Sequence, residues 1–352
     1  MFVENARMIF GKIHGGSARR KKRRRVAIAA GTLALCFIAA LGIDYSLNMS
    51  TSAPVQFFDR ESGRLETEAI FGEKPLRWVY ETHLGQVALW ALIRRAAFSE
   101  IYGFVMSRPA SREKIAPFCE RFGVNVEESA VPVTEFASFN DFFSRRLKPG
   151  ARPVVPAEDV ATLPADGRHL AFPKISAATR FYAKGQRFDL EKFLGDAALA
   201  ARYADGAMVC SRLCPTDYHR FHFPVAGTPA APRVVNGALY SVNPIALSKN
   251  LAYLWENKRV VVEIDSPRFG KVLQVLVGAT NVGTIVPTYA AGTPTEKGAE
   301  LGYFRFGGSF IATIFEPGKI RLADDLCANS AQGVETFAKM GTELGKAVAE
   351  RK

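Results

Sequence analysis

The chain lacks the motifs that identify several common protein classes. Its five cysteines among 352 residues are scattered, which excludes a disulfide framework. It has no G-x-x-x-x-G-K-[ST] loop and no G-x-G-x-x-G turn, so the usual nucleotide-binding motifs are missing. It also has no G-x-S-x-G elbow, which disfavours an α/β-hydrolase.

Positive charge is scarce outside the N-terminus, although the net charge of the chain is +12. Residues 1–25 contain nine Lys or Arg and one Glu, a net charge of +8, which leaves +4 for the other 327 residues. The body of the protein therefore has no basic footprint for nucleic acid, and we expect no such partner.

An uncharged apolar run follows this basic segment directly. Residues 26–43 form 18 apolar or small residues, at the short end of the length of a transmembrane helix. A cleaved signal peptide, with small residues at 50–52 as its cleavage site, is the alternative, but the charged segment before the run is long for one. We expect an uncleaved single-pass anchor in the cell membrane. The basic segment 1–25 is then cytoplasmic, 44–56 is a linker and the rest is non-cytoplasmic.

The remainder has the composition of a folded protein, with 48% hydrophobic and 23% charged residues. We predict one α+β domain over 57–352, helical to about residue 150 and mostly β from 151 to 352. Residues 75–106 are predicted to be helical, with two apolar stripes that suit either a bundle core or a surface lying on lipid. A final helix is predicted over 331–351.

Local signals give several boundaries. Ser111 is expected to cap a helix that ends at Gly123, and Ser138 to cap one that runs to about Lys148. Short runs rich in β-formers predict strands; they are "AMVCSRL", "YHRFHFP", "RVVVEI", "VLQVLVGAT" and "FIATIF".

Four side chains of the β region are candidates for chemistry. Asp166 lies in the turn "PADG", His219 and His222 lie in "DYHRFHFP", and Ser309 follows two glycines in "FRFGGS". Their types match a nucleophile, a base and an orienting acid, but residues three apart in a strand face opposite sides, so the two histidines need different roles. Each also has a plain structural interpretation, as a turn residue or a buried histidine.

A zinc site is the alternative for the same segment. Cys210, Cys214, His219 and His222 include two thiols and two imidazoles. The H-x₂-H spacing and the short gap between the pairs do not match structural zinc sites, so we expect no metal.

Several segments in order resemble the phosphatidylserine decarboxylase family, over roughly residues 56–346. They are "FNDFFSRRLKPGARP", "PADG", "DYHRFHFP", "LYSVNPIAL", "VGATNVGTI", "GAELGYFRFGGS" and "GVETFAKMGTELG". The resemblance implies a chain that cuts itself between Gly308 and Ser309 to give chains 1–308 and 309–352, which stay together as a heterodimer. Ser309 would attack the carbonyl of Gly308, and elimination and hydrolysis would turn residue 309 into a covalent pyruvoyl cofactor.

The resemblance also implies the roles of the other residues. His222 would be the base, Asp166 would orient it, and His219 would assist decarboxylation of phosphatidylserine to phosphatidylethanolamine at the lipid bilayer. Phe310 departs from the family pattern, which has Thr or Ser after the nucleophile. This predicts hindered processing that Phe310→Thr would speed up. The alternatives are an uncut, non-catalytic lipid-binding homologue and a pyruvoyl decarboxylase of a related serine lipid.

Overall fold

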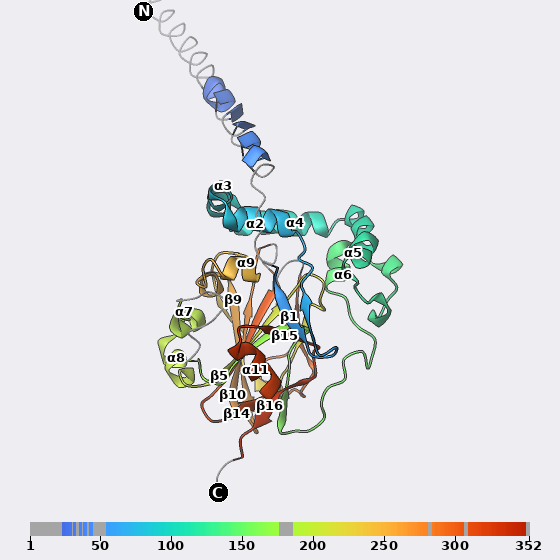
Figure 1. The fold of residues 1–352 in the computed structure, drawn as a ribbon, viewed down its shortest axis with the longest axis vertical. Coiled ribbons are helices and arrows are strands. Elements are labelled where there is room, and N and C mark those ends of the chain that lie inside the picture. The colour runs from blue at the N-terminus through green and yellow to red at the C-terminus, as the bar shows by residue number, and fades with distance from the viewer. Residues whose placement is uncertain are drawn as a thin grey trace, which may run out of the picture.

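The computed structural model describes residues 23–29, 31–32, 35–36, 38–40, 42–44, 54–175, 186–280, 284–305 and 309–349. These residues form a mixed α+β structure in which helices surround three β-sheets (Figure 1). The predicted α+β class with a mostly β body is confirmed. The strands are β1 (Gln56–Asp59), β2 (Arg64–Thr67), β3 (Val160–Thr162), β4 (Gly167–Phe172), β5 (Ala207–Leu213), β6 (Arg220–His222), β7 (Thr228–Pro229), β8 (Arg233–Val235), β9 (Arg259–Ser266), β10 (Gly270–Val277), β11 (Ile285–Pro287), β12 (Glu300–Phe304), β13 (Ser309–Phe315), β14 (Ile320–Leu322), β15 (Glu335–Ala338) and β16 (Glu343–Ala347).

One ten-stranded sheet dominates the body. Its order is β2-β1-β15-β4-β5-β13-β10-β9-β7, with β8 also paired to β9. Two three-stranded sheets, β11-β12-β6 and β14-β16-β3, complete the β structure. Strands distant in sequence are therefore neighbours, and β13 lies between β5 and β10 near the middle of the large sheet.

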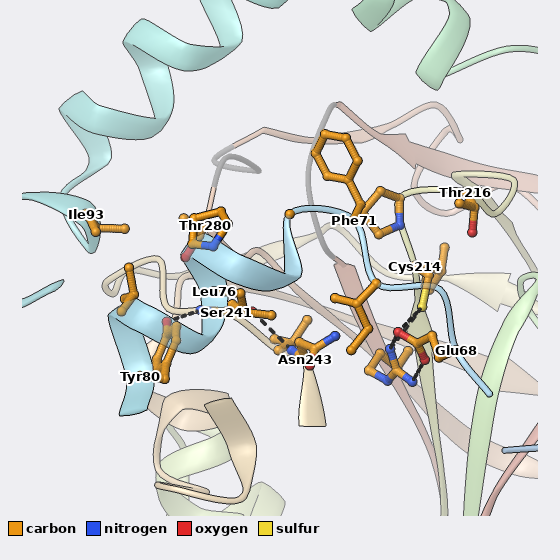
Figure 2. Close-up of a pocket in the computed structure, with 18 of the residues that line it drawn as sticks. Glu68, Phe71, Leu76, Tyr80, Ile93, Cys214, Thr216, Ser241, Asn243 and Thr280 are labelled. Carbon is orange, nitrogen blue, oxygen red and sulfur yellow. Dashed lines mark hydrogen bonds and ion pairs between the residues drawn. The ribbon is translucent and has the colours of Figure 1, made fainter. Parts of the chain in front are cut away.

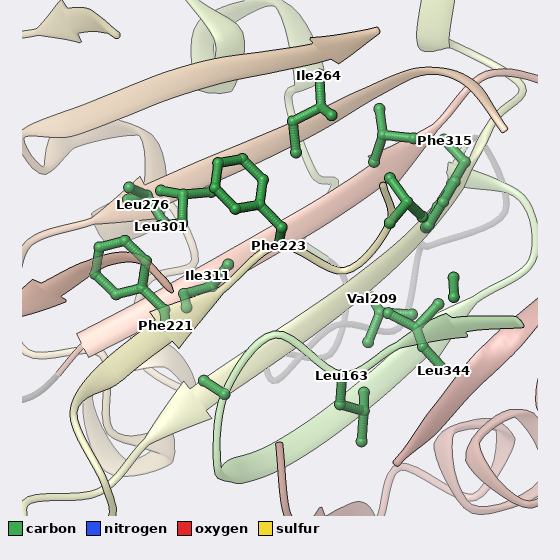
Figure 3. Close-up of a cluster of buried hydrophobic side chains, with 14 of the residues drawn as sticks. Leu163, Val209, Phe221, Phe223, Ile264, Leu276, Leu301, Ile311, Phe315 and Leu344 are labelled. Carbon is green, nitrogen blue, oxygen red and sulfur yellow. The ribbon is translucent and has the colours of Figure 1, made fainter. Parts of the chain in front are cut away.

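The large sheet separates two apolar cores. Side chains of a strand alternate between its faces. On β13, Ile311 and Phe315 pack in the core shared with β6, β12 and the other small sheet, whereas Phe310, Ala312 and Ile314 pack on the opposite face. Figure 3 shows the first of these cores, with Phe221 and Phe223 close to Ile311.

Helices cover the sheets on several sides (Figure 1). The α-helices are α2 (Glu73–Glu81), α3 (His83–Ala88), α4 (Ala96–Met106), α5 (Ile115–Phe122), α6 (Phe139–Phe143), α7 (Leu190–Leu194), α8 (Ala197–Tyr203), α9 (Pro244–Leu247), α10 (Tyr253–Glu256) and α11 (Asp324–Ala331). A π-helical turn η1 (Leu89–Ile93) joins α3 to α4, and 3₁₀ turns are η2 (Pro109–Lys114), η3 (Val126–Glu128) and η4 (Val133–Glu135).

The N-terminal helices agree with most of the sequence signals. The helical prediction for 75–106 is confirmed by α2, α3, η1 and α4. Gly123 ends α5 with a φ of 63°, and the Ser138 hydroxyl caps α6, although α6 ends at Phe143 rather than near Lys148. The prediction that Ser111 caps a helix was wrong. Its hydroxyl accepts a hydrogen bond from the Phe139 N–H and so joins η2 to α6.

The predicted helix over 331–351 was also wrong. The helix there is α11, which ends at Ala331, and β15 and β16 follow it. Gly333 and Gly341 have positive φ angles of 75° and 86°, which interrupt a right-handed helix before each strand. The hairpin β1–β2, by contrast, was not predicted, and it joins the large sheet through parallel pairing of β1 with β15.

The predicted anchor 26–43 and linker 44–56 lie partly outside the described residues, and most of the segment 1–25 lies outside them. Among the helices that the structure describes, none has both the length and the apolar character needed to cross a bilayer.

Candidate active site

Ser309 is the first residue of β13. It is opposite Leu213 of β5, and its side chain shares the face of Ile311, toward the small sheet that contains β6. Ser309 is fully buried, and its Oγ has no hydrogen-bond partner among the described residues. An unsatisfied buried hydroxyl typically costs about 1–3 kcal/mol, so this hydroxyl weakens the fold and is a candidate for function.

Strand pairing links Ser309 to the segment that carries the histidines. β5 leads through residues 214–219 into β6, β12 pairs with β6, and β13 pairs with β5. The Phe304 N–H of β12 donates to the His219 carbonyl at 3.0 Å, and Ser309 of β13 pairs with Leu213, the last residue of β5. His219 therefore lies in the segment that begins directly after the pairing partner of Ser309.

His222 is held as a neutral imidazole with a defined tautomer. Its Nδ1 is 2.9 Å from the Gly298 carbonyl oxygen, which can only accept, so Nδ1 carries the hydrogen. Nε2 is therefore the basic nitrogen, and the Tyr218 hydroxyl donates to it at 3.2 Å. Burial lowers the pKa of His222 and raises that of Tyr218, which keeps the imidazole neutral and the phenol protonated. His222 is thus in the form that a general base requires.

His219 has different neighbours. Its Nδ1 donates to the Asp217 carbonyl oxygen at 3.0 Å, and its ring lies 3.8 Å from that of Phe143, centroid to centroid. His219 is fully buried beside α6, whereas His222 contacts the turn before β12. The two imidazoles therefore occupy separate environments, with His222 in β6 and His219 directly before that strand.

Asp166 is fixed in the turn before β4. Arg152 donates to both carboxylate oxygens, from Nε at 2.8 and 2.9 Å and from Nη2 at 2.6 Å. The Met340 N–H donates to Oδ1 at 2.8 Å. Asp166 is 3% exposed and raises the pKa of His222 through its charge, although burial lowers that pKa by more.

The charge of Asp166 acts on His222, but the four candidate residues do not form a hydrogen-bonded chain in the described part of the structure. Among the described residues, Asp166 makes no hydrogen bond to His222, and the Ser309 hydroxyl contacts neither histidine through one. No sequence signal gives Gly298, Tyr218 or Arg152 a role. All three lie within the segments that resemble the family, but their contacts become visible only in three dimensions.

The four residues of the zinc alternative are dispersed. Cys210 lies in the helix-covered core, which is the core of Phe310, Ala312 and Ile314 on the face of the large sheet packed against α7, α8, α9 and α10. The Cys214 thiol lies 2.9 Å from Arg212 Nη1 and 3.2 Å from Glu68 Oε1. The described part of the chain contains no group of three or more potential metal ligands.

Comparison with known proteins decides the family. A family model described as phosphatidylserine decarboxylase matches residues 139–346. A relative from Chlamydia trachomatis serovar L2 named "Phosphatidylserine decarboxylase proenzyme" is 44% identical over 82% of this chain and 96% of its own length. Relatives of the same name from Chlamydia pneumoniae and Chlamydia caviae are 43% and 42% identical, each over 84% of this chain, and 98% and 99% of their lengths are covered. The chain belongs to the phosphatidylserine decarboxylase family.

Phe310 follows Ser309 directly, at the position where the resemblance predicts Thr or Ser. Its ring is fully buried in the helix-covered core, on the opposite face of β13 from Ser309. A threonine at this position would also direct its side chain away from the Ser309 face. The ring therefore acts on this site through the packing of β13 rather than by covering the serine.

A cavity of about 330 Å³ lies between the N-terminal helices and the end of β5. In Figure 2, Leu76 and Tyr80 approach it from α2, and Cys214 and Thr216 line it from the segment after β5. Most of its lining is apolar, and Leu213, the pairing partner of Ser309, is part of it. Its charged floor is paired internally, because Arg212 Nη2 is 2.6 Å from Glu68 Oε2.

Proposed function

We propose that this family member is a self-cleaving proenzyme that decarboxylates phosphatidylserine to phosphatidylethanolamine. The buried, unpartnered hydroxyl of Ser309 carries the proposal, together with membership of a family whose relatives are named proenzymes. Such a hydroxyl has no competing partner to give up when it attacks, and no hydrogen bond is lost when the residue is converted to a carbonyl.

Processing would begin with the transfer of the Ser309 proton to a base. The Ser309 Oγ bonds to the carbonyl carbon of Gly308, a residue outside the described part of the chain, and the C–N bond breaks to leave an ester and a free amine. Loss of the Ser309 Cα proton then expels the Gly308 carboxylate. Water then displaces the nitrogen of residue 309, which leaves as ammonia, and residue 309 becomes a pyruvoyl group.

His222 is the base that the geometry supports best. Its Nε2 has an available lone pair because Nδ1 is committed to Gly298, and its lowered pKa keeps that lone pair unprotonated at neutral pH. The Tyr218 hydroxyl has to give up this nitrogen before Ser309 can use it. His219 remains for the later reaction, in which it would hold or move a proton near the reacting carbon.

The pyruvoyl group would supply an electron sink for loss of carbon dioxide from the serine head group. The chain's own part is to hold the lipid and exclude water. The cavity supports this role because its apolar lining suits the apolar portion of a lipid and reaches Leu213 beside Ser309.

The two products of the cut would remain one folded unit. Residues 309–349 contribute β13 and β15, each of which lies between two strands of the large chain. They also contribute β16, which pairs with β3 of the large chain on one side and with β14 on the other. Removing the small chain would break the ladders on both sides of β13 and expose two apolar cores.

A membrane location is part of the proposal. The helices η1 and α4 expose Trp90, Ile101 and Phe104 by 61%, 67% and 64%. Arg94 and Arg95 lie over the Trp90 ring, an arrangement that suits a lipid interface. Asp44, at the end of the expected anchor, accepts a hydrogen bond from Trp78 Nε1 of α2 at 2.7 Å. An anchor ending there would hold these helices close to the bilayer.

Intact mass of the purified protein tests the proposal. The wild-type chain should give a fragment of residues 309–352 with a pyruvoyl N-terminus that co-purifies with the remainder, together with release of carbon dioxide from phosphatidylserine. Ser309→Ala should give a single uncut chain with no activity. Cleavage of Ser309→Ala would refute the mechanism, and an uncut, inactive wild-type chain that binds lipid would favour the non-catalytic alternative.

A further inference from the structure

Residues 152–155 form a short segment that contacts Asp166 and Gly298, two of the residues that act on His222. The segment follows the 3₁₀ turns of the helical region and precedes β3 in the chain. Arg152 binds the Asp166 carboxylate at one end, and Val154 packs against Gly298 at the other. The segment thus contacts the acid and the glycine whose carbonyl fixes the tautomer of His222.

The packing of the segment leaves little room for movement. A Cβ on Gly298 would lie 2.6 Å from Val154 Cγ2, and a Cβ on Gly341 would lie 2.5 Å from the Pro153 carbonyl oxygen. The Val155 N–H donates to the Gly341 carbonyl at 3.0 Å. Bare glycine backbone is therefore needed at two places for the segment to lie this close to the site.

Arg152 also links Asp166 to a second carboxylate. Its Nη1 is 2.9 Å from Glu128 Oε2, and Glu128 belongs to η3 in the helical region. The Arg152 and Asp166 side chains are 9% and 5% exposed, whereas that of Glu128 is 24% exposed. The Arg152 guanidinium thus neutralises the buried Asp166 carboxylate, and the outer Glu128 carboxylate offsets part of the positive charge of Arg152.

We propose that Arg152 is a positioning residue for self-processing, which holds the Asp166 carboxylate away from direct bonding to His222 and limits the field of that carboxylate at the imidazole. The proposal rests on the proposed function of Ser309 and His222. In this arrangement Asp166 acts on His222 only through its charge, which Arg152 partly neutralises, and the Gly298 carbonyl orients the imidazole.

The charges facing His222 determine the sign of the effect. Asp166 and Glu300 raise its pKa, Arg220 lowers it, and the Tyr218 hydroxyl contacts Nε2 as a neutral donor. Removing the positive charge of Arg152 leaves the Asp166 carboxylate uncompensated beside His222, and that negative charge favours the protonated imidazole. His222 then binds its proton at a higher pH. Neutralising Glu128 removes a negative charge beside Arg152 and should therefore lower the pH at which His222 binds its proton.

The experiment measures the rate of cleavage of newly synthesised full-length chain against pH, by denaturing electrophoresis, in liposomes of phosphatidylethanolamine and phosphatidylglycerol. For Arg152→Met we expect the acid limb of the profile to move up by roughly one pH unit. Arg152→Lys should keep the wild-type limb with a lower maximal rate, because lysine retains the charge but loses the fork that contacts both oxygens. Glu128→Gln should move the limb down by a smaller amount.

Arg321→Met is the matched control, because Arg321 is exposed and pairs with Asp324 on the surface. An unshifted acid limb in Arg152→Met, with rates reduced equally at all pH values, would show a purely structural role and overturn the inference. If Arg152→Met does not fold, Glu128→Gln decides, and an unchanged or raised limb in that variant overturns the inference. Failure of the wild-type chain to cleave through Ser309 would instead refute the proposed function.

Discussion

Replacing Phe310 by threonine, the residue type expected there from the family, should destabilise this protein and should not accelerate its processing. The Phe310 ring is fully buried among the apolar side chains on the helix-covered face of β13. The hydroxyl of Ser309 lies on the other face. A threonine at 310 would therefore leave a void in one core and provide no hydroxyl to the other face.

The magnitude follows from the size of the void. Truncation of a fully buried phenylalanine to a small side chain costs about 3–5 kcal/mol, since transfer and cavity terms add. With an unfolding entropy of about 2.1 cal/mol/K per residue, a domain of roughly 300 residues changes its Tm by about 1.6 °C per kcal/mol, so we expect Phe310→Thr to lower Tm by about 5–8 °C. Phe310→Leu, which keeps most of the volume, should cost less than half as much.

The assay separates stability from processing. Thermal unfolding is measured in the uncut Ser309→Ala background, so that every sample is a single chain. The cleavage half-life is measured at a temperature well below the Tm of each variant. Ile314→Thr is the matched control, because Ile314 is buried on the same face of β13 but lies farther along the strand from the cut.

Two results would refute this reasoning. One is faster cleavage in Phe310→Thr with an unchanged Tm, which would mean that the ring hinders the acyl shift, as the sequence alone suggests. The other is an unchanged Tm in Phe310→Thr when Ile314→Thr lowers its own Tm, which would mean that the Phe310 ring adds nothing to this core.

The remaining predictions concern the histidines, the membrane and acid stability. His222→Ala should halt cleavage and His219→Ala should cleave normally but turn over lipid poorly; gel and lipid assays that gave the reverse pattern would exchange the two roles. A C-terminal reporter should be active only on the non-cytoplasmic side, and reporter activity in the cytoplasm would contradict the proposed orientation. Trp90→Asp should weaken co-sedimentation of the protein with anionic liposomes, and undiminished binding would contradict the proposed docking face. Burial lowers the pKa of His169 from 6.5 to about 3, so the unfolded chain takes up this proton first as the pH falls. Uncut Ser309→Ala protein should thus lose up to about 1.4 kcal/mol of stability per pH unit from this residue between pH 6.5 and 3, and His169→Gln should lose less in denaturant titrations; an equal loss would contradict this assignment.

Local patterns determined much of the secondary structure. The run "AMVCSRL" coincides with β5, and "FIATIF" coincides with all but the first residue of β13, because continuous apolar β-formers specify strands that are buried on both faces. Gly123 and Ser138 marked helix boundaries through backbone and side-chain chemistry that is local. The helix prediction for 331–351 was wrong because two glycines at positive φ and strand pairing with β4 and β3 outweigh the helix-forming residues of this segment.

The types of the site residues could be found from the sequence, and their partners could not. Ser309, His222 and Asp166 stand in recognisable segments, but nothing local shows that Arg152 takes the Asp166 carboxylate or that Gly298 takes the His222 Nδ1–H. Those contacts join positions 14 and 76 residues apart, and hydrogen bonds of this kind depend on which chain segments the sheets bring together. The sequence by itself therefore determined the chemistry available, because side-chain types and turn residues are local properties. Only the tertiary structure decided the tautomer of His222, the face of β13 on which Phe310 lies and the pairing of the buried charges, because each of these depends on long-range packing.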